Sequence, residues 1–266
     1  MATVLLVRHG RTPANTAGVL AGWTPGVQLD DVGREQVAAL AQRLAPLPIV
    51  AAVSSPLERC QQTATAILGE PALDDRPRPA LITDDALGEC RYGDWTGRKI
   101  IDLATEPLWR SVQAHPSAVT FPGPGGESML AMQHRAVEAI RRHDAAVSAE
   151  HGDHAVWMAI SHGDVIKSIL ADALGMHLDA FQRLIVDPCS VSVVRYTPLR
   201  PFAVRVNDAG ADLTALVPPP PKPDGAEEDE PVAAAATAPD GPGANGSGLD
   251  PSDAVVGGSA GPVRTS

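Results

Sequence analysis

The stretch LLVRHGRTPAN at residues 5–15 places an arginine and a histidine directly after an apolar run. The run itself, TVLLV at residues 3–7, has the composition of a strand that is buried on both faces of a sheet. Arg8 and His9 therefore lie where that strand is expected to end. Arg11 adds a further positive charge, so the chemistry of an imidazole among guanidiniums is the first question that the sequence raises.

Strand-like and helix-like stretches alternate along residues 1–210. Short runs rich in Val, Ile, Leu or Ala predict strands at 3–7, 49–55, 155–161, 190–196 and 202–206. Apolar residues at helical spacing predict helices at 30–44, 55–68, 127–150 and 162–175. This alternation predicts an α/β fold with a layered, mostly parallel sheet.

Local signals mark where three of these helices begin. Asp30 or Asp31 can cap the first of them. Ser55 is suited to be the N-cap of the second, with Glu58 completing an S-x-x-E capping box. The stretch GPGGES at residues 123–128 is expected to cap the long helix that follows it.

The overall composition argues against several classes of protein. Of the 266 residues 44% are hydrophobic but only 3% are aromatic, so the core must be built from Ala, Val, Leu and Ile. A net charge of −11 argues against non-specific binding to nucleic acid and against anionic membranes. The sequence has no apolar run of transmembrane length, and its N-terminus reads straight into a strand rather than into a signal peptide.

Cysteine usage bears on the compartment. The chain has three cysteines, an odd number, and their spacing matches neither a disulfide framework nor a metal site. The sequence therefore predicts a cytoplasmic protein that holds no metal.

A change of composition divides the chain at about residue 217. Residues 1–217 are expected to form the folded domain. Residues 218–266 are rich in Pro, Gly and Ala, carry eight acidic and two basic side chains, and contain no aromatic residue. Such a segment buries too little apolar surface to offset its ordering entropy, so we expect a disordered tail.

Three of the expected strands end in residues that suit phosphate. Arg8 and His9 follow the first strand, Arg59 lies in the first turn of the helix after the second, and His162 opens the helix after the third. Because ligands bind outside the carboxyl ends of parallel strands, these side chains should converge. Helix N-termini and guanidinium forks both bind phosphate, so the sequence predicts a phosphate site.

Histidine at the centre of such a site indicates covalent chemistry. A neutral imidazole is a nucleophile near pH 7, and phosphoryl transfer needs little beyond positioning and cations around the phosphoryl oxygens. We expect Arg8 to hold the phosphoryl group while His9 attacks it. The leaving alkoxide needs a proton, for which Glu89 is our choice over the alternatives Asp84, Asp85 and Asp94.

Four blocks taken together resemble the histidine phosphatase superfamily, in its phosphoglycerate mutase-like branch: RHGRTPAN, SSPLERCQQTA, GECRYGDWTG and SHGD. The resemblance spans roughly residues 1–210. It implies a three-layer α/β/α fold and a phosphohistidine intermediate, with no metal and no organic cofactor. By the same resemblance the nucleophile is His9, the proton donor Glu89, and the phosphate pocket Arg8, Asn15, Arg59 and His162, while Gly22 and Trp23 line the entrance.

Departures from the branch's mutases favour a phosphatase. Those mutases carry an arginine directly after the proton donor and a lysine ten positions further on, where this chain has Cys90 and Ile100. They also carry an arginine pair where this chain offers only Arg110. Arg91 and Lys99 can partly replace these charges, and Arg91 is a candidate substrate contact. Arg11, Arg91 and Arg110 can equally be solvated charges.

We therefore expect a hydrolase of small phosphomonoesters, with a phosphoglycerate-type mutase as the alternative. A phospho-ligand sensor without catalysis is a third reading, which the complete set of five expected site residues argues against. The expected partner is a small molecule, not nucleic acid or a membrane, and a homo-oligomer is compatible with the sequence.

The tail leads to the first testable prediction. Truncation after Pro218 should leave the melting temperature and the turnover of the folded domain unchanged, because the removed residues have little to pack with. Thermal unfolding and activity of the full-length and truncated proteins check this. A drop in either quantity would mean that the tail docks on the domain.

Overall fold

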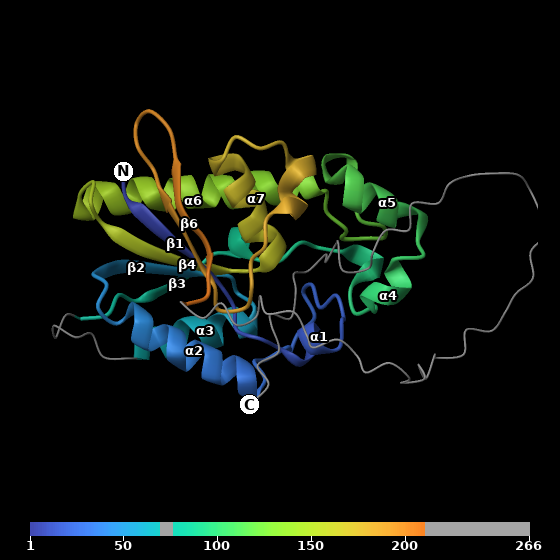
Figure 1. The fold of residues 1–266 in the computed structure, drawn as a ribbon, viewed down its shortest axis with the longest axis horizontal. Coiled ribbons are helices and arrows are strands. Elements are labelled where there is room, and N and C mark those ends of the chain that lie inside the picture. Colours follow the sequence, from blue (N-terminus) through green and yellow to red (C-terminus); the bar gives the residue numbers. More distant parts are fainter. Residues whose placement is uncertain (70–76, 211–266) are drawn as a thin grey trace, which may run out of the picture.

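A computed structural model describes residues 1–69 and 77–210 of the chain (Figure 1). The expected tail, residues 218–266, lies outside the described residues, so its disorder and the domain boundary at residue 217 stay predictions.

In the described residues six strands form one sheet, in the order β3-β2-β4-β1-β5-β6. Neighbours among β1 to β4 run parallel, whereas β5 pairs antiparallel with both β1 and β6. The prediction of a mostly parallel sheet is confirmed. The strands are β1 (Thr3–Arg8), β2 (Ile49–Ser54), β3 (Leu81–Thr83), β4 (Val156–Ser161), β5 (Val191–Arg195) and β6 (Phe202–Asp208).

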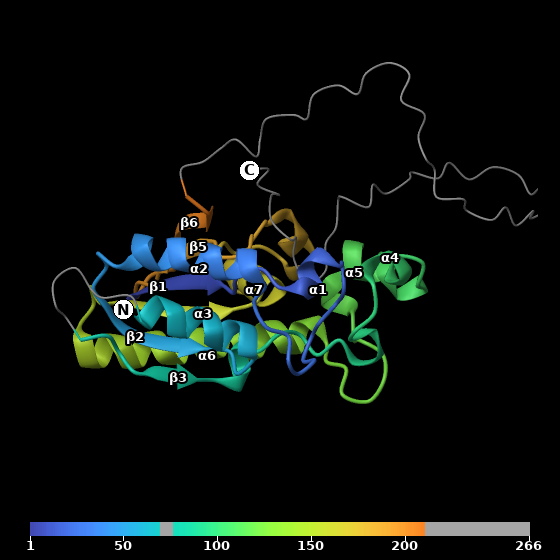
Figure 2. The same ribbon diagram turned by 90° about the horizontal axis from the view of Figure 1, so that it is seen from below.

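Helices cover both faces of this sheet. Figures 1 and 2 show α2 (Asp31–Leu44) and α3 (Glu58–Gly69) on one face, with α6 (Met129–His151) and α7 (Gly163–Ala173) on the other. The three-layer α/β/α architecture is thus confirmed. The shorter helices are α1 (Pro13–Thr16), α4 (Ile100–Leu103), α5 (Pro107–Ala114) and the 3-10 turns η1 (Asp85–Leu87), η2 (Gly93–Trp95), η3 (Pro116–Ala118) and η4 (Leu178–Arg183). None of the described helices is long and apolar enough to span a membrane.

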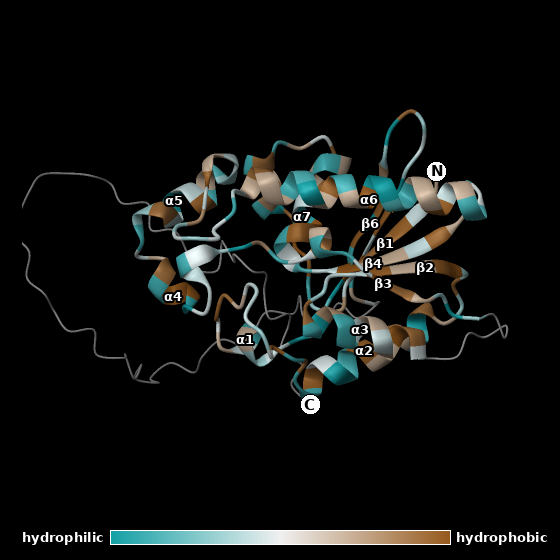
Figure 3. Ribbon diagram, turned by 180° about the vertical axis from the view of Figure 1, so that it is seen from behind, coloured by the Kyte–Doolittle hydropathy of each residue, from teal (hydrophilic) through white to brown (hydrophobic). Residues whose placement is uncertain are grey.

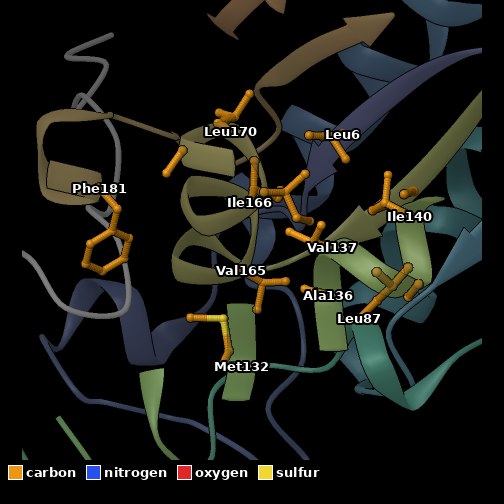
Figure 4. Close-up of a cluster of buried hydrophobic side chains, with 14 of the residues drawn as sticks. Leu6, Leu87, Met132, Ala136, Val137, Ile140, Val165, Ile166, Leu170 and Phe181 are labelled. Atoms are coloured by element: carbon orange, nitrogen blue, oxygen red, sulfur yellow. The ribbon is translucent and has the colours of Figure 1, made fainter. Parts of the chain in front are cut away.

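The core has two parts because β1 is buried on both faces. Val4 and Leu6 belong to the cluster under α6 and α7, whereas Leu5 and Val7 belong to the cluster under α2 and α3. Figure 3 shows the hydrophobic strands between helices whose surfaces are mixed. In Figure 4 the cluster around Leu6 joins β1 to side chains of both α6 and α7. The alternation along one strand thus locks the three layers together.

Two of the three expected helix caps form. Asp30 accepts a hydrogen bond from the backbone N–H of Gly33, and Ser128, within GPGGES, accepts one from Ala131. The capping box at Ser55 is wrong. Glu58 accepts instead from the N–H of Gly26 at 2.9 Å. The Ser55 hydroxyl contacts His162, which directly follows β4, the neighbour of β2 in the sheet. The reciprocal bonds of a capping box are therefore absent between Ser55 and Glu58, and each side chain has a partner remote in sequence.

The start of α2 packs against the backbone that follows β1. A Cβ on Gly10 would lie 2.8 Å from the Gly33 carbonyl oxygen, and a Cβ on Gly33 would lie 2.1 Å from the Arg11 oxygen. Gly10 therefore permits close packing of α2. This contact positions the chain directly after His9.

Replacing Gly33 with alanine should destabilise the domain by about 1–3 kcal/mol, because the new Cβ must displace backbone rather than a flexible side chain. Chemical denaturation of wild type and Gly33→Ala measures this. Gly69→Ala is the matched control, since an added Cβ there meets nothing within 4 Å among the described residues. Equal stability of the two variants would contradict the packing argument.

Candidate active site

The two expected histidines emerge side by side because their strands are parallel neighbours in register. Arg8, the last residue of β1, is aligned with Ser161, the last residue of β4. The next residue of each chain segment is then a histidine, and the His9 N–H donates to the Ser161 oxygen at 3.1 Å. The ring centroids of His9 and His162 lie 5.2 Å apart. The predicted convergence at the sheet edge is therefore present.

His9 is almost completely buried, with 3% of its surface exposed. Burial, followed by the positive charges of Arg59 and Arg8, holds the pKa of its imidazole well below the usual range. The ring is therefore neutral at pH 7. Nδ1 lies 2.8 Å from the Gly10 carbonyl oxygen, which can only accept, so the proton sits on Nδ1. Nε2 keeps its lone pair and is available to act as a nucleophile.

Two buried arginines flank this imidazole. Nη1 of Arg8 donates to the Val186 carbonyl oxygen at 2.7 Å, and Nη2 of Arg59 donates to the Gly22 oxygen at 2.9 Å. Nη1 of Arg59 is also buried, yet it has no hydrogen-bond acceptor among the described residues. A buried guanidinium donor without an acceptor is costly, and an anion beside the imidazole would satisfy it. This arrangement of donors thus fits a phosphoryl group.

His162 is fixed by a residue that the sequence had assigned elsewhere. The Ser55 hydroxyl accepts from the Leu57 N–H at 3.3 Å and lies 2.8 Å from Nε2 of His162. Because a hydroxyl can accept a second hydrogen bond as well as donate one, this contact orients the His162 ring with either tautomer. Burial and the charge of Arg59 hold the pKa of His162 well below its ordinary value, so this ring is neutral as well. Its Nδ1 faces Oε2 of Glu89 at 3.8 Å.

Glu89 is a buried acidic group that the fold brings close to His162 and the two arginines. Its carboxyl is buried, with 4% of the residue exposed, and Oε1 accepts from the Cys90 N–H at 2.9 Å. Burial, with the nearby charge of Asp164 second, raises its pKa to about 7, against the opposing effect of Arg59. A carboxyl with this pKa can give up a proton and take one back near neutral pH.

The alternative carboxylates lie elsewhere. Asp84 binds Arg142 and His143, and although partial burial raises its pKa, the hydrogen bond from His143 and that from a backbone N–H lower it below the ordinary value. Asp85 and Asp94 are exposed to solvent. The choice of Glu89 over these three therefore agrees with the geometry.

Trp23 lies against the segment that carries Glu89. Its Nε1 donates to the Glu89 carbonyl oxygen at 2.6 Å, and its ring occupies the space that a Cβ on Gly88 would need. The Arg91 guanidinium lies over the Trp23 ring, 3.9 Å from its centroid, in the geometry of a cation–π contact. Gly22, as the acceptor for Arg59, belongs to the same wall.

Asn15 and Arg11 are held by structural contacts. Oδ1 of Asn15 accepts from the backbone N–H and the hydroxyl of Thr12, so only the amide nitrogen remains to donate to an anion. Nε of Arg11 donates to Asp30 at 2.8 Å in a half-buried ion pair. Arg11 thus anchors the start of α2.

Sequence reasoning missed the roles of Ser55 and Asp164. Ser55 directly follows β2, and β2 is the neighbour of β4 in the sheet, which brings Ser55 close to His162. The sequence did not give this strand order, so it could not give the contact. Asp164, in the first turn of α7, is buried and accepts from the Tyr92 hydroxyl at 2.8 Å. Among the described residues no group of three or more His, Cys, Asp or Glu side chains could hold a metal ion.

The fold and the arrangement of these side chains are those of one enzyme superfamily. The chain belongs to the histidine phosphatase superfamily (branch 1), whose sequence model matches residues 4–209. It is 32% identical over 197 residues to the Yersinia pestis protein named "Probable phosphoglycerate mutase GpmB", covering 74% of this chain and 86% of that one. It is 28% identical over 189 residues to a 2,3-bisphosphoglycerate-dependent phosphoglycerate mutase 2 of Gloeobacter violaceus, covering 71% and 83%. The alpha-ribazole phosphatase of Shigella flexneri superposes with a TM-score of 0.64 at 25% identity, covering 78% of this chain and 97% of that one.

The pKa of Glu89 leads to a prediction about pH. For an alkyl phosphate, kcat/KM relative to that for p-nitrophenyl phosphate should fall as the pH rises through about 7. Above this pH the carboxyl has lost the proton that an alkoxide needs, whereas p-nitrophenolate leaves without one. Each kcat/KM is first corrected for the ionisation of its own substrate, because the phosphate groups of the two substrates titrate at different pH.

The variant Glu89→Gln tests whether Glu89 causes this fall of the ratio with rising pH. The variant should lower kcat/KM for the alkyl phosphate by about 10²–10⁴-fold at low pH, affect p-nitrophenyl phosphate far less, and make the ratio independent of pH. Steady-state rates across the pH range measure both effects. If the ratio still falls with rising pH in Glu89→Gln, the titrating group is not Glu89.

Proposed function

We propose that the protein hydrolyses the phosphomonoester of a small phosphorylated metabolite, through a phosphohistidine at His9 and without a metal ion. In the first step Nε2 of His9 attacks phosphorus, the bond to the leaving oxygen breaks, and Glu89 gives its proton to that oxygen. In the second step Glu89, now a carboxylate, takes a proton from water as the water attacks the phosphohistidine. Inorganic phosphate leaves and both groups return to their starting states.

The observation that carries this proposal is the state of His9. Its imidazole is neutral, its Nδ1 proton is committed to Gly10, and its Nε2 keeps a lone pair in the field of two buried guanidiniums, those of Arg59 and Arg8. Arg8, Arg59 and His162 are the donors proposed to stabilise the phosphoryl oxygens in the transition state. A structural histidine would not require buried positive charge on either side.

The names of the relatives support phosphoryl chemistry on small molecules, some of them hydrolysis and others transfer between hydroxyl groups. The Shigella flexneri neighbour is named a phosphatase, which supports hydrolysis. The Yersinia pestis and Gloeobacter violaceus relatives are named mutases, which supports return of the phosphoryl group to a second acceptor. A mutase of the phosphoglycerate type is therefore the second candidate.

Residues beyond the phosphate pocket favour hydrolysis. The position after Glu89 holds Cys90, whose buried thiol lies 4.0 Å from the sulfur of Met129 and not in a cationic site. Lys99 and Arg110, the charges nearest in sequence to the mutase pattern, are exposed. Arg91 stacks on Trp23 and is proposed to contact the substrate at the entrance.

The cysteines support a reducing compartment. All three are free and buried, as expected of cytoplasmic thiols that are neither paired nor used. We propose a cytoplasmic location on this ground.

Parallel assays of phosphate release and of phosphoryl transfer between hydroxyl groups separate the two candidates. Over a panel of phosphorylated metabolites we expect phosphate release to exceed transfer. His9→Ala should reduce both by several orders of magnitude, because the variant lacks the imidazole proposed to accept the phosphoryl group. Wild-type turnover in His9→Ala would exclude the covalent mechanism, and transfer faster than release would identify a mutase.

A further inference from the structure

Arg135 uses every N–H of its guanidinium. It lies in the second turn of α6, with 23% of its side chain exposed. Nε donates to Oε2 of Glu127 at 3.0 Å and Nη2 to Oε1 at 2.5 Å. Nη1 donates to the carbonyl oxygens of Ala86 and Gly88, each at 2.8 Å, and Nη2 also donates to that of Glu89 at 3.0 Å. A guanidinium has five N–H donors, and all of them are satisfied here.

The three carbonyls that Arg135 binds belong to the segment that delivers Glu89 to the pocket. This segment, residues 86–89, begins within the turn η1 and continues into the loop before η2. It is paired to no strand among the described residues. The remaining carbonyl, that of Leu87, accepts from the Ser161 hydroxyl at 2.7 Å. Side chains from α6 and from the end of β4 therefore hold a backbone that lacks the ladder of a sheet.

Glu127 extends this restraint to the other side of Glu89. Besides pairing with Arg135, its Oε1 accepts from the Arg91 N–H at 2.8 Å, and its own N–H donates to the Arg91 oxygen at 2.9 Å. The ion pair of Glu127 and Arg135 thus fixes the chain both before and after the carboxyl that we propose as the proton donor. Trp23, as a second donor to the Glu89 oxygen, closes the arrangement from the entrance side.

We propose that Arg135 is a positioning residue for proton transfer, and that it acts on catalysis only through the placement of Glu89. This inference rests on the proposed function. Arg135 contacts backbone carbonyls and the Glu127 carboxylate and not the reacting atoms, so its loss should displace the Glu89 carboxyl while leaving His9 and the phosphate donors in place. A displacement of about 1 Å at a reacting group can cost about 10²-fold in rate.

Lysine cannot replace arginine in this position. An ammonium has three donors on one atom, whereas the carbonyls and the carboxylate that Arg135 binds are spread along the edges of a planar group. Arg135→Lys therefore keeps the charge and removes the geometry. Arg141→Met is the matched control, since Arg141 lies on the same helix, is 56% exposed and pairs with Asp172, away from the segment that carries Glu89.

The test compares two leaving groups. In Arg135→Lys and Arg135→Met, kcat/KM should fall about 10²-fold for an alkyl phosphate but less than about 3-fold for p-nitrophenyl phosphate, whose leaving group needs no proton. Arg141→Met should change neither. Retained activity on p-nitrophenyl phosphate also shows that each variant is folded, and Arg135→Lys provides the test if Arg135→Met is unstable.

Combining each substitution with Glu89→Gln isolates the route of the effect. If Arg135 acts through Glu89, Arg135→Lys should cause no further loss on the alkyl phosphate once the carboxyl has been removed. An equal loss on both substrates, or an additive loss in the double variant, would overturn the inference and leave the proposed function standing. An unmodified enzyme inactive on both substrates would overturn the proposed function, and this inference with it.

Discussion

Positive charge buried at the carboxyl ends of parallel strands is the constraint on which the rest of the site depends. Arg8 and Arg59 are almost fully excluded from water, and burial is the main cause that lowers the pKa of Arg8. Their field, added to burial, keeps the imidazoles of both histidines neutral. The same field opposes the burial and the negative charge of Asp164 that raise the pKa of Glu89, so that this pKa settles at about 7. One electrostatic arrangement thus produces the neutral imidazole, the buried guanidiniums and the titratable carboxyl that the proposed mechanism uses.

The fold supplies this arrangement by different means for different residues. Regular structure places the histidines, because β1 and β4 are parallel neighbours in register. The acid comes from a segment without regular pairing, which side chains from α6, β4 and the loop around Trp23 hold by its carbonyl groups. The orientation of His162 depends on Ser55, which reaches it from the end of β2. The relative positions of these side chains therefore depend on the packing of all three layers.

Strand ends are the part of the site that the sequence predicts well. Short apolar runs identify the strands, and the rule that ligands bind at their carboxyl ends is enough to bring Arg8, His9 and His162 together. Local motifs are less informative where tertiary contacts compete with them. Ser55 and Glu58 fit a capping box by spacing, yet each has a partner remote in sequence. No local signal separates Arg135 from the other arginines of α6, because its role depends on a loop 49 positions away.

The atom that carries the phosphoryl group tests the central claim most directly. Rapid mixing with p-nitrophenyl phosphate, an alkaline quench that preserves phosphohistidine, and analysis of the labelled peptide by mass spectrometry and NMR would locate the group. The tautomer fixed by the Gly10 carbonyl predicts phosphorylation of His9 on Nε2. A phosphoryl group on Nδ1 of His9 or on His162, or turnover without any adduct, would contradict the account.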